Sequence, residues 1–147
     1  MLKYGTKQLV QNVDYTASYS LNFAIGTASV KITGKGNYTG TLTKSFDIVP
    51  KTPSFKEEYT SVTDAVRINW GKIDNATGYR IYRYNEKNKS WDNITTIKDN
   101  TVLTYRDEGL KSGTVYRYKV KAYKKVGDVN YWGFASDEKY TATAPDK

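Results

Sequence analysis

Lysine, arginine and tyrosine alternate along two segments in the second half of the chain, a pattern that could bind an anionic or sugar-rich polymer. If both segments are β-strands, their outward side chains share one face of a sheet. Aromatic rings stack on sugars, and Lys and Arg donate charge-assisted hydrogen bonds to anions. The candidate binding residues are Arg80, Tyr82, Tyr84, Arg117, Lys119, Lys121 and Tyr123. A purely structural interpretation is preferred, because solvated sheet faces are common and Tyr pairs well with Lys or Arg across strands.

The residue types exclude several kinds of catalytic site. The chain has no Cys and no His, so it lacks thiol nucleophiles, Ser-His-Asp triads and zinc sites built on Cys or His. Its Asp and Glu residues are scattered, with no spaced run of oxygen ligands such as a calcium loop needs. Two carboxylates alone could still hydrolyse a glycoside, but a thin β-sandwich offers no deep cleft to hold them. We therefore expect no enzymatic activity, no metal and no cofactor.

The net charge and the hydropathy of the chain restrict the classes of partner that it can have. The net charge is +8 over 147 residues, but the basic residues are mixed with acidic ones and no oligonucleotide-binding signature is present, so we expect no nucleic acid partner. No apolar run approaches the roughly 20 residues that span a bilayer, which excludes membrane insertion by this segment. The first residues lead directly into polar sequence without a signal-peptide pattern. If the parent protein is exported, we expect its targeting segment to lie outside this sequence.

Short alternating runs predict β-strands in the first part of the chain. Apolar and hydroxyl side chains alternate over 15–20, 28–33 and 42–48, which gives each run one core face and one wet face. The glycine-rich stretch 34–40 predicts a tight turn, because Gly and Asn tolerate positive φ. Residues 1–49 are therefore expected to form a small β-module. Whether it is complete or N-terminally truncated, and whether Leu2 to Val10 supply its edge strand, are left open.

A proline-rich stretch separates the two halves. Pro50 and Pro53 fix φ and remove hydrogen-bond donors, so 50–53 are predicted to be a semi-rigid linker with few tertiary contacts. The second domain is then 54–147.

The second domain has the more regular pattern. Alternating runs predict strands near 66–70, 79–84, 94–97, 103–105 and 116–123, a hairpin turn at Gly127-Asp128 and a last strand from about Tyr131 to Thr143. Short strands at this spacing predict an all-β fold, an antiparallel seven-stranded Ig-like sandwich. The predicted core residues are Val66, Ile68, Trp70, Tyr79, Ile81, Tyr105, Leu110, Tyr116, Tyr118, Val120 and Ala122.

Residues 53–144 resemble the fibronectin type III module. The resemblance rests on Trp70 in the second strand, on 78–82 in the third, on 105–107 in the fifth, and on 110–116 leading into the sixth. It implies structural roles for four residues, namely Trp70, Tyr79, Leu110 and Tyr116. Leu110 would close the bottom of the core, and the Tyr116 hydroxyl would bond back to nearby backbone as a tyrosine corner. Trp91 and Trp132 are expected to cover the ends of the sandwich, with a sugar platform as the alternative.

The first half is similar to Ig-like repeat modules of Gram-positive bacterial surface proteins. The residues that carry the similarity are 13–19, 26–30 and 34–40, followed by Phe46 and Ile48. Together the two resemblances imply a bacterial cell-surface or secreted multidomain protein, so an extracellular location is expected. The expected function is that of a structural spacer that presents neighbouring domains of the same polypeptide. The alternative is a module that binds carbohydrate or an acidic cell-wall polymer, attached to a secreted hydrolase.

Overall fold

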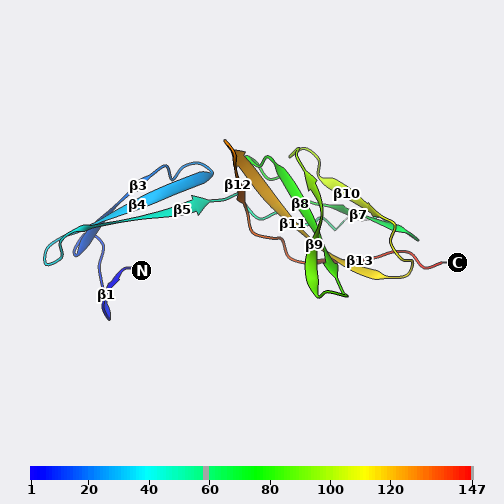
Figure 1. The fold of residues 1–147 in the computed structure, drawn as a ribbon, viewed down its shortest axis with the longest axis horizontal. Helices are drawn as coiled ribbons and strands as arrows, with labels where there is room; N and C mark the ends of the chain where they lie inside the picture. The colour runs from blue at the N-terminus through cyan, green and yellow to red at the C-terminus, as the bar shows by residue number, and fades with distance from the viewer. Residues whose placement is uncertain (58–59, 147) are drawn as a thin grey trace. The chain divides into compact units, whose positions relative to one another are not determined.

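The computed structural model describes residues 1–57 and 60–146, and all of its regular elements are β-strands (Figure 1). The chain divides into two compact units, Met1–Ile48 and Val49–Lys147. In the described residues, no helix is long and apolar enough to cross a bilayer. The predicted all-β, antiparallel class is confirmed.

The first unit is a three-stranded antiparallel sheet with a separate small hairpin. The sheet has the order β3-β4-β5, formed by Tyr15–Ser20, Gly26–Gly34 and Thr41–Ile48. The hairpin consists of β1 (Lys3–Tyr4) and β2 (Lys7–Gln8), which pair with each other. The residues from Leu2 to Val10 thus contain the turn considered for them, but β1 and β2 are not strands of the larger sheet, and β3 forms one of its edges.

The glycine-rich connection between β4 and β5 requires its glycines. Gly34 donates its amide to the carbonyl of Gly40 over 2.9 Å, which closes the loop. A Cβ at Gly34 would lie 2.7 Å from the carbonyl oxygen of Tyr38, and Gly36 has φ +64°. The loop therefore has the tight backbone path that the sequence predicts.

The second unit contains two antiparallel sheets. One has the order β10-β7-β6. The other has the order β12-β11-β8-β9, and β13 pairs with the first half of β11. The strands are β6 (Thr60–Val62), β7 (Ala65–Asn69), β8 (Gly78–Asn85), β9 (Ser90–Ile97), β10 (Thr104–Glu108), β11 (Val115–Val126), β12 (Val129–Trp132) and β13 (Lys139–Ala142).

The predicted last strand, Tyr131 to Thr143, is wrong in one respect, because the structure divides it into β12 and β13. Between them the Ser136 hydroxyl accepts the amide of Val120 over 3.0 Å, so a side chain replaces a ladder carbonyl at this point. The described residues of the second unit therefore contain eight strands rather than seven.

The core lies between the two sheets of the second unit. The buried cluster contains the predicted residues from Val66 to Ala122, and Tyr105 and Tyr116 pack against it partly buried. Trp70 follows β7, where it forms an isolated bridge with Phe55, and its ring meets that of Tyr79 edge-on at 5.5 Å. Leu110 is buried as a member of the cluster.

The stretch 50–53 does not behave as the contact-poor linker that its prolines suggested. Pro53 is among the fully buried side chains of the chain, and Pro50 is buried as well. The Pro50 carbonyl approaches Gly133 so closely that a Cβ there would lie 2.6 Å from its oxygen. Proline rings are apolar as well as rigid, so these two pack into the second unit.

The tyrosine corner is present. The Tyr116 hydroxyl accepts a hydrogen bond from the Lys111 amide over 2.9 Å, within the predicted backbone segment. We expect Tyr116→Phe to lower the free energy of unfolding of the second unit by about 1 kcal/mol, because one intramolecular hydrogen bond is lost.

Urea unfolding followed by tryptophan fluorescence measures this effect, since all three tryptophans lie in the second unit. The matched control is Tyr140→Phe, whose hydroxyl is on an exposed side chain. Equal stabilities of the two variants would show that the corner contributes nothing specific.

Candidate functional site

The predicted binding residues gather on the outer face of the β11-β8 pair, where each cation lies against an aromatic ring. Register places Lys119 opposite Tyr82 and Lys121 opposite Arg80. The cation-to-centroid distances are 4.1 Å for Arg80 on Trp132, 5.6 Å for Lys121 on Tyr82, 4.4 Å for Lys119 on Trp91 and 4.0 Å for Arg117 on Tyr84. We call these eight residues the outer ladder. In the outer ladder, each cation is attracted to the face of its aromatic ring by a cation–π interaction.

Arg117 is held from two sides within the outer ladder. Its guanidinium donates to Oε2 of Glu138 through Nε at 3.0 Å and Nη2 at 2.7 Å. Glu138 also accepts the Tyr140 hydroxyl at 3.0 Å and lies 3.4 Å from the Lys119 ammonium. The hydrogen bond from Arg117 lowers the pKa of Glu138 below the ordinary value. Two of the four ladder cations, Arg117 and Lys119, therefore share one carboxylate partner and also lie against a ring.

Six of the seven candidate residues lie half-buried on this face, and Tyr123 is the exception. Only 5% of Tyr123 is exposed, because the ring of Trp132 lies across it at a centroid distance of 4.7 Å. The expectation of an outward, accessible ring at Tyr123 is therefore wrong. Strand alternation gives the face on which a side chain lies but not what covers it.

The two other large rings are displaced from their expected places. Trp91 on β9 is opposite Tyr84, and Trp132 on β12 is opposite Tyr123, so both lie on the sheet face rather than over the ends of the sandwich. Sequence reasoning also missed Glu138 and Tyr140. Only the pairing of β13 with β11, which sets Arg117 opposite Tyr140, brings these residues to the outer ladder.

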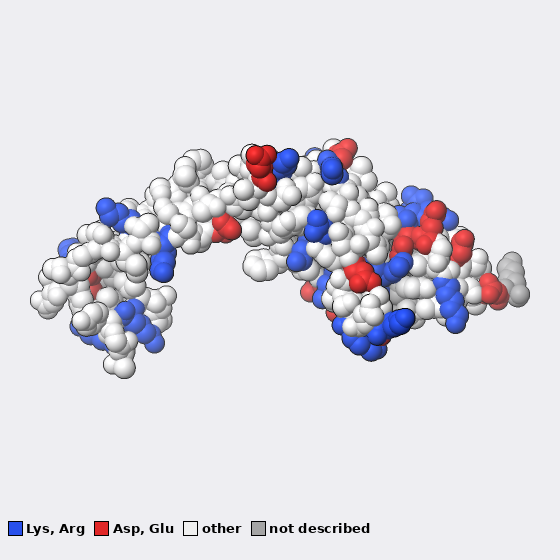
Figure 2. All heavy atoms as spheres, viewed as in Figure 1, with Lys and Arg blue, Asp and Glu red and all other residues white. Residues whose placement is uncertain are grey.

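Charges of both signs are mixed over the second unit. On the face drawn in Figure 2, its Lys and Arg residues are interspersed with Asp and Glu. Several basic side chains have acidic partners, for example Lys89 with Glu86 at 2.9 Å and Arg106 with Glu108 at 2.6 Å. No continuous basic track is visible on this face.

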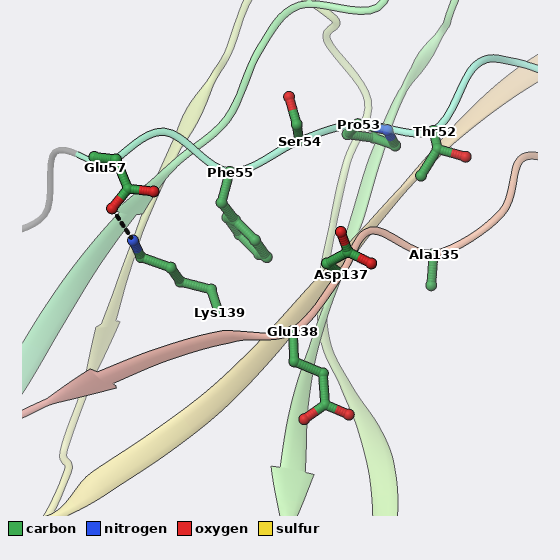
Figure 3. Close-up of a pocket in the computed structure, with 9 residues that line it drawn as sticks. All are labelled: Thr52, Pro53, Ser54, Phe55, Glu57, Ala135, Asp137, Glu138 and Lys139. Atoms are coloured by element: carbon green, nitrogen blue, oxygen red, sulfur yellow. Dashed lines mark hydrogen bonds and ion pairs between the residues drawn. The ribbon is translucent and has the colours of Figure 1, made fainter.

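A shallow groove of about 430 Å³ lies between the segments 52–57 and 135–139 (Figure 3). Three carboxylates line it, but Glu57 pairs with Lys139 at 3.5 Å and Glu138 pairs with Arg117. Glycoside hydrolysis needs one carboxylic acid with a raised pKa as proton donor. The pKa of Glu138 is shifted in the opposite direction. No group of three or more possible metal ligands occurs among residues 1–57 and 60–146.

A buried polar cluster, absent from the sequence predictions, lies at the edge of the core. Oδ2 of Asp107 accepts Nη1 of Arg83 and the hydroxyl of Tyr118, both at 2.7 Å. Only 5% of Asp107 is exposed. Burial, with the nearby carboxylate, raises the pKa of Tyr118 far above its ordinary value, so the phenol stays a donor. Arg83 follows Tyr79 and Ile81 at a spacing of two along β8, and this shared face is the signal that could have indicated its inward direction.

Comparison with known proteins gives matches for part of the chain. No family model matches it. A stretch of 99 residues is 31% identical to an α-amylase of Niallia circulans, a match that covers 65% of this chain and 7% of the amylase. The chain thus spans only a small part of this relative.

Solved structures that share the fold over much of the chain include two with TM-scores above 0.5. A human fibronectin type III domain, from fibronectin type III domain containing protein 3, aligns with a TM-score of 0.56 and 20% identity over 69% of this chain and 92% of that one. A β-1,2-glucanase from Parabacteroides distasonis aligns with a TM-score of 0.53 and 18% identity over 82% of this chain and 18% of that one. The similarity of 1–49 to bacterial surface repeats stays a prediction. The second unit of the chain has the fibronectin type III fold.

Proposed function

We propose that this chain is a non-catalytic spacer in a secreted or cell-surface, carbohydrate-active bacterial protein. The observation that carries the proposal is where the two ends of the second unit lie. Near its start, the Pro50 carbonyl lies against Gly133, whose amide bonds to the carbonyl of Ala122. Near its end, the Ala144 carbonyl accepts the amide of Gly113, just before β11 begins at Val115.

The two ends are therefore separated along β11. From Val115 to Ala122 a strand rises roughly 23 Å at about 3.3 Å per residue. A chain that passes through the unit is therefore displaced by roughly 23 Å. Such an arrangement holds the flanking segments apart, which is the physical task of a spacer.

The link to carbohydrate-active proteins comes from the relatives. One is named an α-amylase and the other a β-1,2-glucanase, and the matched region is 7% and 18% of those chains. A small matched share suits an accessory module better than a catalytic domain. The absence of His and Cys also leaves few ways to activate a nucleophile.

A carbohydrate-binding role is weaker on this geometry. Sugar stacking needs an open ring face, whereas the rings of the outer ladder already lie against Arg80, Arg117, Lys119 and Lys121. The spacer function requires a fixed separation of the two ends and no sugar affinity. The binding function requires a measurable affinity that depends on Trp91 or Trp132.

Both requirements can be measured on the intact chain. Because it has no cysteine, Lys51→Cys together with Pro145→Cys accepts two spin labels at the two ends of the second unit. We expect one narrow distance distribution, unchanged by starch, β-1,2-glucan or cell-wall polymer, and no retention on these polysaccharides. A broad distribution would contradict the spacer. If the chain is retained on a polysaccharide, and this retention is lost in Trp91→Ala but kept in Tyr140→Phe, the binding function would replace the spacer function.

A further inference from the structure

The sheet of the first unit has one polar and one apolar face. Directly opposed residues of antiparallel strands share a face. One face contains only hydroxyl or charged side chains, namely Thr16, Ser18, Ser20, Thr27, Ser29, Lys31, Thr33, Thr41, Thr43, Ser45 and Asp47. The other contains Tyr15, Ala17, Tyr19, Ala28, Val30, Ile32, Leu42, Lys44, Phe46 and Ile48, with the glycines Gly26 and Gly34. A sheet of this composition is one half of a sandwich.

The apolar face is covered unevenly. At one end the β1-β2 hairpin approaches, and a groove of about 230 Å³ is lined by Leu2, Leu9, Ile32 and Leu42 among others. Farther along the face Ala28 is buried, but Tyr19 is 56% exposed and Phe46 is 39% exposed. An apolar surface of this extent destabilises a protein in water unless another surface buries it.

We propose that the first unit self-associates through this apolar face, so that two copies of the chain form a two-fold symmetric β-sandwich. The area of the face supports this occupant. Three strands about 4.8 Å apart, with about seven residues each at about 3.4 Å, give a footprint of roughly 14 by 24 Å. In flat projection two such faces total roughly 700 Å², and side-chain relief brings the buried area to at most about 1,000 Å², the lower limit for a specific interface. The dimer should therefore be weak and depend on concentration.

Lys44, the single charged residue on the apolar face, favours a dimer that does not grow into larger assemblies. Lys44 belongs to β5, an edge strand, so its ammonium can extend past the rim into water while its methylenes remain on the apolar face. An inward-facing lysine on an edge strand also discourages edge-to-edge growth into longer sheets. Face-to-face packing of two sheets about 10 Å apart then uses up the apolar surface, and no surface remains for a third copy.

Sedimentation equilibrium of the full chain tests the proposal. The weight-average mass should rise with concentration from 16.7 kDa towards twice that value. Phe46→Glu should weaken the association at least about tenfold, which corresponds to 1.4 kcal/mol or more. The matched control, Ser45→Glu, changes the neighbouring residue on the polar face and should leave the association unchanged. Tryptophan fluorescence verifies that the second unit is unaltered in both variants.

A cross-linking experiment keeps the proposal testable if Phe46→Glu fails to fold. Val30 lies on β4, the central strand, and faces the proposed partner, whereas the adjacent Lys31 lies on the polar face. With a short bismaleimide, Val30→Cys should be captured as a covalent dimer and Lys31→Cys should not. A strict monomer at every concentration, or equal capture of both cysteines, would overturn the proposal. So would a dimer that Phe46→Glu leaves intact.

Discussion

Trp70→Ala is expected to lower the free energy of unfolding of the second unit by about 3–5 kcal/mol, as for other buried large-to-small replacements. Trp70 is fully buried between the two sheets, where its ring contacts Tyr79 edge-on. The alanine would leave a cavity that β-strands, fixed by their ladders, cannot close. Because a domain is stable by only about 5–15 kcal/mol, much of the folded population could be lost at moderate urea.

The matched variant is Trp70→Phe. Among the described residues, the indole N–H of Trp70 has no hydrogen-bond partner, and an unpaired buried donor costs about 1–3 kcal/mol. Phenylalanine keeps most of the ring and removes that donor, so we expect a much smaller loss than for alanine. Urea titrations read by Trp91 and Trp132 fluorescence, with circular dichroism as a second probe, measure both. Equal losses for the two variants would mean that ring volume does not determine stability here.

The second large effect is expected for Asp107→Ala, at about 3 kcal/mol. Removing one member of a buried ion pair leaves the other without its partner, which is far more destabilising than the pair is stabilising. Here the Arg83 guanidinium and the Tyr118 hydroxyl both lose their acceptor. The guanidinium retains partial access to water, since a third of the Arg83 side chain is exposed, and this limits the loss.

The adjacent residue provides the control for Asp107. Glu108 pairs with Arg106 at 2.6 Å, but both side chains are exposed. Exposed ion pairs contribute at most about 1 kcal/mol, so Glu108→Ala should change stability little. Thermal unfolding of both variants at neutral pH gives the comparison. If the two alanines cost the same, the Asp107 cluster is not the stabilising element inferred from its burial.

The sequence predicts most of the fold, because alternation and tertiary structure agree over the longest strands. In β11 the even-numbered residues from Tyr116 to Ala122 face the core, as their period of two requires. The division between β12 and β13 was not predictable in this way. It depends on the Ser136 hydroxyl and on the close approach of Pro50 to Gly133, which join residues far apart in the sequence.

The candidate site was predicted only as a face. Residue types and strand spacing placed Arg80, Lys119 and Lys121 together, and the register confirms that arrangement. The rings over Lys119 and Arg80 are Trp91 and Trp132, which come from β9 and β12, and the pairing partners of these two strands cannot be read from alternation. Tyr123 shows the limit clearly, since an outward residue becomes buried when Trp132 from the next strand lies over it.

Strand connectivity also has a consequence for the order of folding. In the first unit β3, β4 and β5 each pair with the next strand in the chain, and such hairpins form in about 1–10 µs. In the second unit β7 pairs with β10 and β8 with β11, and the Ala144 amide bonds to the carbonyl of Val62, so its closure waits for distant segments to meet. Sheets of that kind take roughly milliseconds to seconds. The first sheet therefore exists, apolar face included, well before the second core has closed, and a nascent chain is most prone to aggregate in that interval.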